Sequence, residues 1–212
     1  MRSAFDKLIS FTGLALVAVL ITAGGLLTWA NTFIGDQVHD QLTMQGITMP
    51  EGDAVASLPQ ADQDALKPFA GSALDTGPEA KAFSDHYILA HMNASSTELA
   101  GEVLPYAQVS AKARELGGAV AENPNATQAE IDEAAEWGAL KQSLLDGNTL
   151  RGLLLYGYAF ATIGTIAGIA AFVSFGAAGL LLVLVLLGFW HAGRNEEHTA
   201  ERIVPARVAQ HA

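Results

Sequence analysis

The feature that most constrains this chain is the stretch from Gly152 to Trp190, thirty-nine consecutive residues without a charged side chain. A helix needs only about 20 apolar residues to cross roughly 30 Å of hydrocarbon. At about 1.5 Å per residue, one helix over the whole stretch would be nearly twice as long as the membrane is thick. The stretch therefore predicts a membrane span with an apolar remainder that must be covered by something else.

A membrane hairpin is the alternative for this stretch. The break nearest its middle is Ser174-Phe175-Gly176, which leaves only fourteen residues, Ala177 to Trp190, for the second arm. Fourteen residues are too few to cross the hydrocarbon. We therefore predict one continuous or gently kinked helix, with 167–190 in the lipid and 151–166 projecting from it.

A second uncharged run, Leu8 to Trp29, follows a short head that carries Arg2 and Lys7. It is long enough to span, and Trp29 is suitably placed as an aromatic anchor at the interface. A cleaved signal peptide is the alternative, since Thr28-Trp29-Ala30 resembles a small-x-small cleavage site. The run is longer than a usual signal core, so we predict a transmembrane helix at 8–30.

The basic residues that flank the two spans predict the topology. Most follow the last span or precede the first, so both termini should be cytoplasmic, in a two-pass protein of the plasma membrane. The segments are then a cytoplasmic N-terminus at 1–7, a span at 8–30, an extracytoplasmic domain at 31–150, an outward extension of the second helix at 151–166, a span at 167–190 and a cytoplasmic tail at 191–212.

The region from Phe33 to Leu150 is strongly acidic, with eighteen acidic and five basic side chains. It reads either as a solvated face or as a landing surface for a basic partner. Turn residues and apolar periodicity divide it into helices at about 60–69, 78–92, 105–117 and 127–146, the last ending at Asp146-Gly147. We therefore predict an all-α membrane protein: two transmembrane helices flanking a small helical extracytoplasmic domain, the second continuing outward as a long helix.

Residue types that carry chemistry are scarce. The chain has no cysteine, a net charge of −11 and no nucleophile elbow, phosphate loop or HExxH motif. His86 and His91 are five residues apart and would point about 140° apart on a helix, so they cannot share a metal. His39 lies near Asp36 and Asp40, a weak group for a cation. We predict no catalytic residue, no metal, no cofactor of its own and no nucleic-acid partner.

The second predicted span and its outward extension are rich in small and aromatic residues, which could contact a partner. Gly164 and Gly168 form a small-xxx-small pair with Gly176 nearby, which would serve packing between the two spans or docking onto another membrane protein. An apolar, aromatic shoulder precedes them at the outer interface. The predicted partner interface comprises Leu153, Leu154, Tyr156, Tyr158, Phe160, Gly164, Gly168 and Gly176.

The run Thr149-Leu150-Arg151-Gly152-Leu153-Leu154-Leu155, followed by Tyr156-Gly157-Tyr158, resembles a pattern of actinobacterial two-span membrane proteins. The segments Pro105 to Ser110 and His86 to Met92 fit the same family. In size and layout the chain is also similar to the small accessory factor of the actinobacterial cytochrome bcc-aa3 respiratory supercomplex. That resemblance implies a non-catalytic subunit that contacts cytochrome bc or cytochrome c oxidase subunits.

Two hypotheses about function follow. In the first, the protein is an accessory subunit whose spans and outer shoulder dock to a larger membrane complex and support its assembly or stability. In the second, it stands alone and binds a ligand or metal through a sensory ectodomain that uses His39, His86 or the acidic surface.

Overall fold

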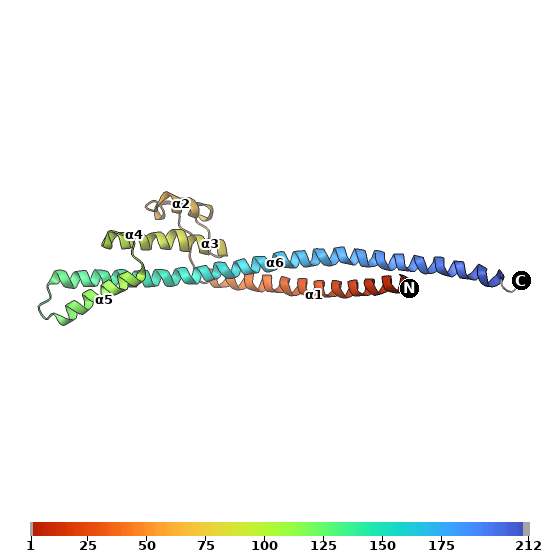
Figure 1. Cartoon of the computed structure of the whole chain (residues 1–212). Coiled ribbons are helices and arrows are strands. Elements are labelled where there is room, and N and C mark those ends of the chain that lie inside the picture. Colours follow the sequence, from red (N-terminus) through yellow and green to blue (C-terminus); the bar gives the residue numbers. More distant parts are fainter. Residues whose placement is uncertain (1, 210–212) are drawn as a thin grey trace. The chain divides into compact units, whose positions relative to one another are not determined.

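The computed structural model describes residues 2–209 and is mostly helical there. Two helices dominate it: α1 (Arg2–Thr43) and α6 (Gln128–Ala209) (Figure 1). Each is long and apolar enough to cross a membrane. The described residues contain no strand, only an isolated bridge between Thr48 and Ala73. The all-α class and the two candidate spans are therefore confirmed.

The helix α6 runs without interruption through the whole uncharged stretch, so the prediction of one continuous helix is confirmed and the hairpin is wrong. The first helix is also longer than expected, because α1 continues beyond residue 30 to Thr43. The chain divides into two compact units. One holds the residues up to Phe33 together with those from Ile163 onward, and the other holds Ile34 to Thr162.

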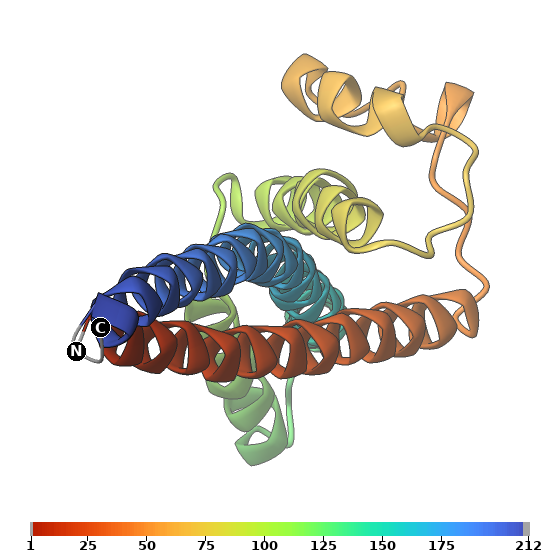
Figure 2. The same ribbon diagram turned by 90° about the vertical axis from the view of Figure 1, so that its right-hand side faces the viewer.

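In the first unit, α1 and α6 lie antiparallel in close contact (Figures 1 and 2). Ser10 faces Gly188, Gly13 faces Val185, and Asn31 faces Gly168. Buried or half-buried residues recur every seventh position on both helices, as is typical of left-handed helix pairs. They are Ser10, Val17, Gly24 and Asn31 on α1, and Gly164, Ala171, Ala178, Val185 and Ala192 on α6.

The outward-facing surface of this helix pair is apolar. Phe172 is 81% exposed and Leu180 is 67% exposed, and aliphatic side chains surround them on both helices. Soluble monomers rarely expose an apolar surface that extends along two whole helices, whereas the hydrocarbon of a membrane covers such a surface favourably. The seam between the helices is accordingly made of small residues, which let two backbones approach where no hydrophobic effect drives them together.

The second unit contains the remaining helices: α2 (Gln60–Leu66), α3 (Gly77–Ala82), α4 (Leu89–Ala100) and α5 (Tyr106–Glu122), with short 3₁₀ turns at Gly52–Ala54 and Lys67–Phe69. A π-helical turn, Phe83–Ile88, joins α3 to α4. In this unit α5 folds back beside the start of α6 (Figure 1). One core gathers α1, α2, α3 and α6 around Leu42, Leu66 and Leu154, and a smaller core joins α4, α5 and α6 around Met92, Val109 and Leu144.

Three expected helix ends are wrong, each for a local reason. The helix expected to end near Met92 continues to Ala100, where Gly101 takes a left-handed φ of 78° and caps it. The helix α5 passes through Gly117-Gly118 and ends before Pro124, since the residue preceding a proline avoids the helical region. Gly147 lies inside α6 because its missing side chain admits Met92, whose Sδ would be 2.5 Å from an added Cβ.

Candidate functional site: the aromatic stripe of helix α6

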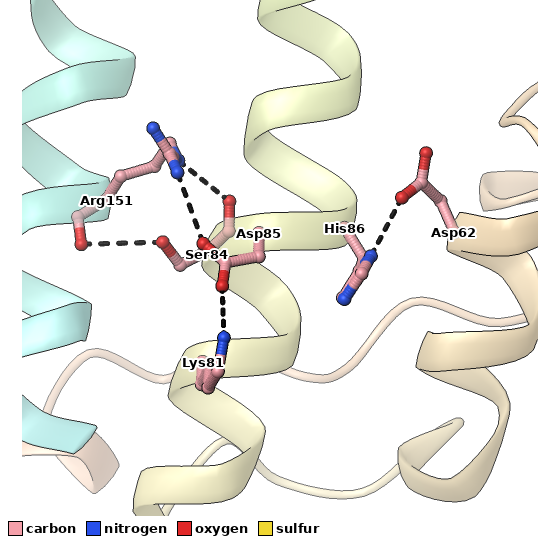
Figure 3. Close-up of polar contacts among 6 residues, drawn as sticks. All are labelled: Asp62, Lys81, Ser84, Asp85, His86 and Arg151. Atoms are coloured by element: carbon pink, nitrogen blue, oxygen red, sulfur yellow. Dashed lines mark hydrogen bonds and ion pairs between the residues drawn. The ribbon is translucent and has the colours of Figure 1, made fainter.

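An anchor at Arg151 determines which face of α6 turns toward the other helices of the second unit. The Arg151 Nε donates a hydrogen bond to the Ser84 carbonyl at 3.0 Å, and its Nη2 contacts Asp85 Oδ1 at 3.2 Å (Figure 3). In return the Ser84 hydroxyl lies 3.5 Å from the Arg151 carbonyl. The Ser84 carbonyl also accepts the Leu89 N–H, five residues on, as a π-turn requires. Arg151 thus joins α6 to the π-turn.

Two cations, Lys81 and Arg151, share the single carboxylate of Asp85 in this anchor. Burial raises the pKa of Asp85, but hydrogen bonds from Lys81 and Arg151 outweigh it and hold that pKa below its ordinary value. The hydrogen bond to Asp85 raises the pKa of Lys81 in turn. Both cations therefore stabilise an ionised Asp85, and the cluster is a structural ion-pair network.

The face of α6 that carries Arg151 is covered by its own chain. Leu154 is 1% exposed and belongs to the larger core. Lys81 Nζ lies 5.7 Å from the centre of the Tyr158 ring, in cation–π geometry. Gly77 approaches so closely that an added Cβ would lie 2.5 Å from the Ala161 Cβ. Leu154 and Tyr158, both predicted as partner contacts, instead serve the internal packing of this unit.

The opposite face of α6 carries an aromatic stripe, which we define as Leu153, Tyr156 and Phe160. These side chains are 58%, 66% and 55% exposed. Their spacing of three and four places them along one line, about half a turn of the helix away from Leu154 and Tyr158. The stripe is the part of the predicted interface that remains uncovered by the described residues of this unit.

The neighbouring turns of α1 are charged at the level of the stripe. Leu42 lies against Gly157, 3.6 Å from the position of an added Cβ, in an antiparallel arrangement. Stepping two residues back along α1 brings Asp40 level with Ala159, between Tyr156 and Phe160. Asp36, His39 and Asp40 are all exposed. Apolar side chains on one helix therefore stand beside carboxylates on the next.

The predicted glycine contacts lie in the first unit and divide between two environments. Gly164 is buried in the helix seam, and an added Cβ on Gly168 would be 2.8 Å from Asn31 Oδ1. Gly176 is exposed, with nothing within 4 Å of an added Cβ. Of the two uses considered for the small-xxx-small pair, the structure supports packing between α1 and α6.

The histidines of the second unit pair separately. His86 Nδ1 is 2.8 Å from Asp62 Oδ1, and His39 Nδ1 is 3.8 Å from Asp75 Oδ2. His91 Nδ1 lies 2.9 Å from the Tyr87 carbonyl. The expected grouping of His39 with Asp36 and Asp40 is thus replaced by a contact with Asp75, and no group of three metal-binding side chains occurs among the described residues.

Sequence reasoning missed the importance of Arg151, Ser84 and Asp85. Arg151 is the last charge before the uncharged stretch, and the sequence analysis assigned it no contact with another helix. Its position was a usable signal, because a lone base at the head of an apolar run needs a carboxylate nearby when it is half-buried. The seven-residue recurrence of small residues along α1 and α6 was a second signal, visible in the sequence.

Comparison of the chain with protein-family models, with curated proteins and with solved structures gives no match.

Proposed function

We propose that the chain is a non-catalytic accessory subunit of a membrane complex and that the aromatic stripe is its docking face. The observation that carries the proposal is the exposure of Leu153, Tyr156 and Phe160 beside charged turns of α1. Carboxylates are expensive in hydrocarbon, so a level that holds Asp36 and Asp40 belongs outside the lipid. Lipid tails therefore do not cover the stripe, and another protein is the cover that its chemistry requires.

The composition of the stripe also suits docking. Tyrosine and phenylalanine provide large contact areas with few rotatable bonds and are enriched in the buried centres of protein interfaces. The anchor at Arg151 holds this face of α6 in one orientation, and a preorganised face loses little entropy on binding. The sequence resemblance directs the proposal to the respiratory cytochrome bcc-aa3 supercomplex, with cytochrome bc or cytochrome c oxidase subunits as partners and a role in assembly or stability.

The test is to replace the stripe by serine, as Leu153→Ser, Tyr156→Ser and Phe160→Ser together, in the full chain expressed in its own membrane. After extraction in a mild detergent, mass spectrometry identifies what co-elutes with the protein. We expect the triple variant to lose respiratory subunits at least tenfold while its helix content, from circular dichroism, stays unchanged.

A matched control replaces exposed apolar residues elsewhere in the second unit, Val103→Ser and Ile131→Ser, and should leave co-elution intact. Undiminished recovery of the same partners by the triple variant would contradict the docking role of the stripe. Recovery of the wild-type chain alone, together with saturable metal binding in a titration, would favour the alternative of a ligand-binding ectodomain that uses His39 or His86.

A further inference from the structure

Within the first unit, a groove opens between α6 and the N-terminal turns of α1. Its volume is about 350 Å³, and Ile9, Ser10 and Gly13 line one wall. The other wall is α6 from Leu181 to His191. Glycine and serine cause the groove, because Ser10 meets Gly188 and Gly13 meets Val185 at the seam, and these small residues leave space beside the contact.

The dimensions of the groove match one hydrocarbon chain. From Leu181 to His191 the helix rises about 15 Å, which is half of the roughly 30 Å hydrocarbon thickness. An acyl chain in one leaflet of the bilayer extends over that same distance. A helix from another protein, roughly 10 Å across, would need a wider trough. The lining is apolar except for Ser10 and His191.

The polar end of the groove is basic. His191 closes it, and the antiparallel pairing of Ser10 with Gly188 brings Lys7, three residues earlier, level with His191. Arg194 lies nearly one turn further along α6, its guanidinium 4.8 Å from the centre of the Trp190 ring. Stacking occupies the face of a guanidinium, while its N–H donors lie in the plane and suit phosphate oxygens. These bases stand out in a chain whose net charge is −11.

We propose that this groove binds an anionic phospholipid, with one acyl chain along Leu184 and Gly188 and the phosphate at Lys7, His191 and Arg194. The site rests on insertion of the two helices into a membrane and is independent of the aromatic stripe. Apolar complementarity holds the chain of the lipid, and the bases select a negative headgroup. The bound lipid fills the space beside the seam and stabilises the contact between α1 and α6.

The test compares phosphatidylglycerol with phosphatidylcholine as the added lipid, using the full chain in a mild detergent. Native mass spectrometry counts bound lipids, and thermal unfolding measures stabilisation. We expect saturable binding of phosphatidylglycerol and a raised unfolding temperature, with at least tenfold weaker binding of phosphatidylcholine. Equal binding of the two lipids would overturn the proposal.

Substitutions in and beside the groove locate the binding. Leu184→Trp fills the groove from an exposed position and should weaken phosphatidylglycerol binding at least tenfold, whereas Leu180→Trp, on the same helix outside the lining, should leave it unchanged. Ile9→Trp fills the groove from α1 and replaces Leu184→Trp if that variant fails to fold. Lys7→Gln with Arg194→Gln should abolish the preference for phosphatidylglycerol. Wild-type binding by both Leu184→Trp and Ile9→Trp would place the lipid elsewhere and refute the site.

Discussion

Glu79 shows how one side chain organises a loop in the second unit. It is 8% exposed, and its carboxylate accepts hydrogen bonds from the Ser72 hydroxyl, the Thr76 hydroxyl and the backbone N–H groups of Asp75 and Thr76. Burial raises the pKa of Glu79, but these four hydrogen bonds outweigh it and the pKa lies below its ordinary value. The carboxylate thereby ties residues 72–76 to the first turn of α3.

This pKa gives a pH dependence with a definite sign. A carboxyl whose pKa is lower in the folded than in the unfolded state stabilises the fold above its unfolded pKa, and that contribution disappears as pH falls through the folded pKa. The second unit should therefore lose stability below about pH 4. Chemical unfolding of the wild type and of Glu79→Gln between pH 7 and pH 3 measures this loss as a change in the free energy of unfolding. The variant should be less stable at pH 7 and show a flatter acid response, with Glu133→Gln on the exposed surface of α6 as the control.

Gly77 is the residue whose missing side chain matters most for the packing of α3 on α6. An added Cβ would lie 2.5 Å from the Ala161 Cβ and 3.3 Å from the Tyr158 Cα, and a backbone atom cannot rotate away. Gly77→Ala should destabilise the second unit by about 1–3 kcal/mol through overpacking.

Gly138→Ala is the matched control for Gly77→Ala, since nothing lies within 4 Å of its added Cβ and it sits inside α6. It should stabilise the helix by roughly 0.5–1 kcal/mol. Urea unfolding followed by circular dichroism compares the two. Equal effects of the two substitutions would show that Gly77 is not a close-packing position.

At the scale of elements, the seam of α1 and α6 distinguishes neighbouring glycines. An added Cβ on Gly24 would be 2.9 Å from the Phe175 ring, whereas one on Gly25 meets nothing within 4 Å. Gly24→Leu should force the helices apart at a cost of about 1–3 kcal/mol, and Gly25→Leu should change stability by no more than about 0.5 kcal/mol.

Unfolding of both leucine variants in detergent, monitored by tryptophan fluorescence, measures this difference. The two substitutions are equal in size and hydrophobicity and differ only in the face of α1 on which they fall. Similar destabilisation by Gly25→Leu would mean that α1 packs on α6 through a different face.

At the scale of the whole molecule, the predicted topology has a direct test because the chain contains no cysteine. Single cysteines introduced as Ser3→Cys and Glu133→Cys report the two sides of the membrane. In intact cells a membrane-impermeant maleimide should label the cysteine at position 133 alone, and both after permeabilisation. Labelling of position 3 in intact cells would show that the N-terminus lies outside the cell, and the predicted topology would be wrong.

The sequence by itself determined the helical class, the two apolar helices and the continuity of α6, because each follows from local composition. The two long uncharged runs predict the spans, and the break at Ser174-Phe175-Gly176 leaves too few residues after it for another span. It also marked Leu153, Tyr156 and Phe160 as part of a candidate interface. The helix end expected at Gly147 is wrong because Met92 from another helix occupies the space beside that glycine, a contact that local sequence does not reveal. No such contact exists at Gly117, where nothing lies within 4 Å of an added Cβ, and α5 simply continues through it.

Only the tertiary structure decided which apolar residues of α6 remain uncovered. Leu153 and Leu154 are adjacent and chemically identical, yet one is 58% exposed and the other 1%. The difference arises from the rotation of α6 about its axis, which depends on contacts between residues far apart in the chain. Arg151 with Ser84 and Asp85, and Gly77 with Ala161, set that rotation, and no local pattern in the sequence encodes it.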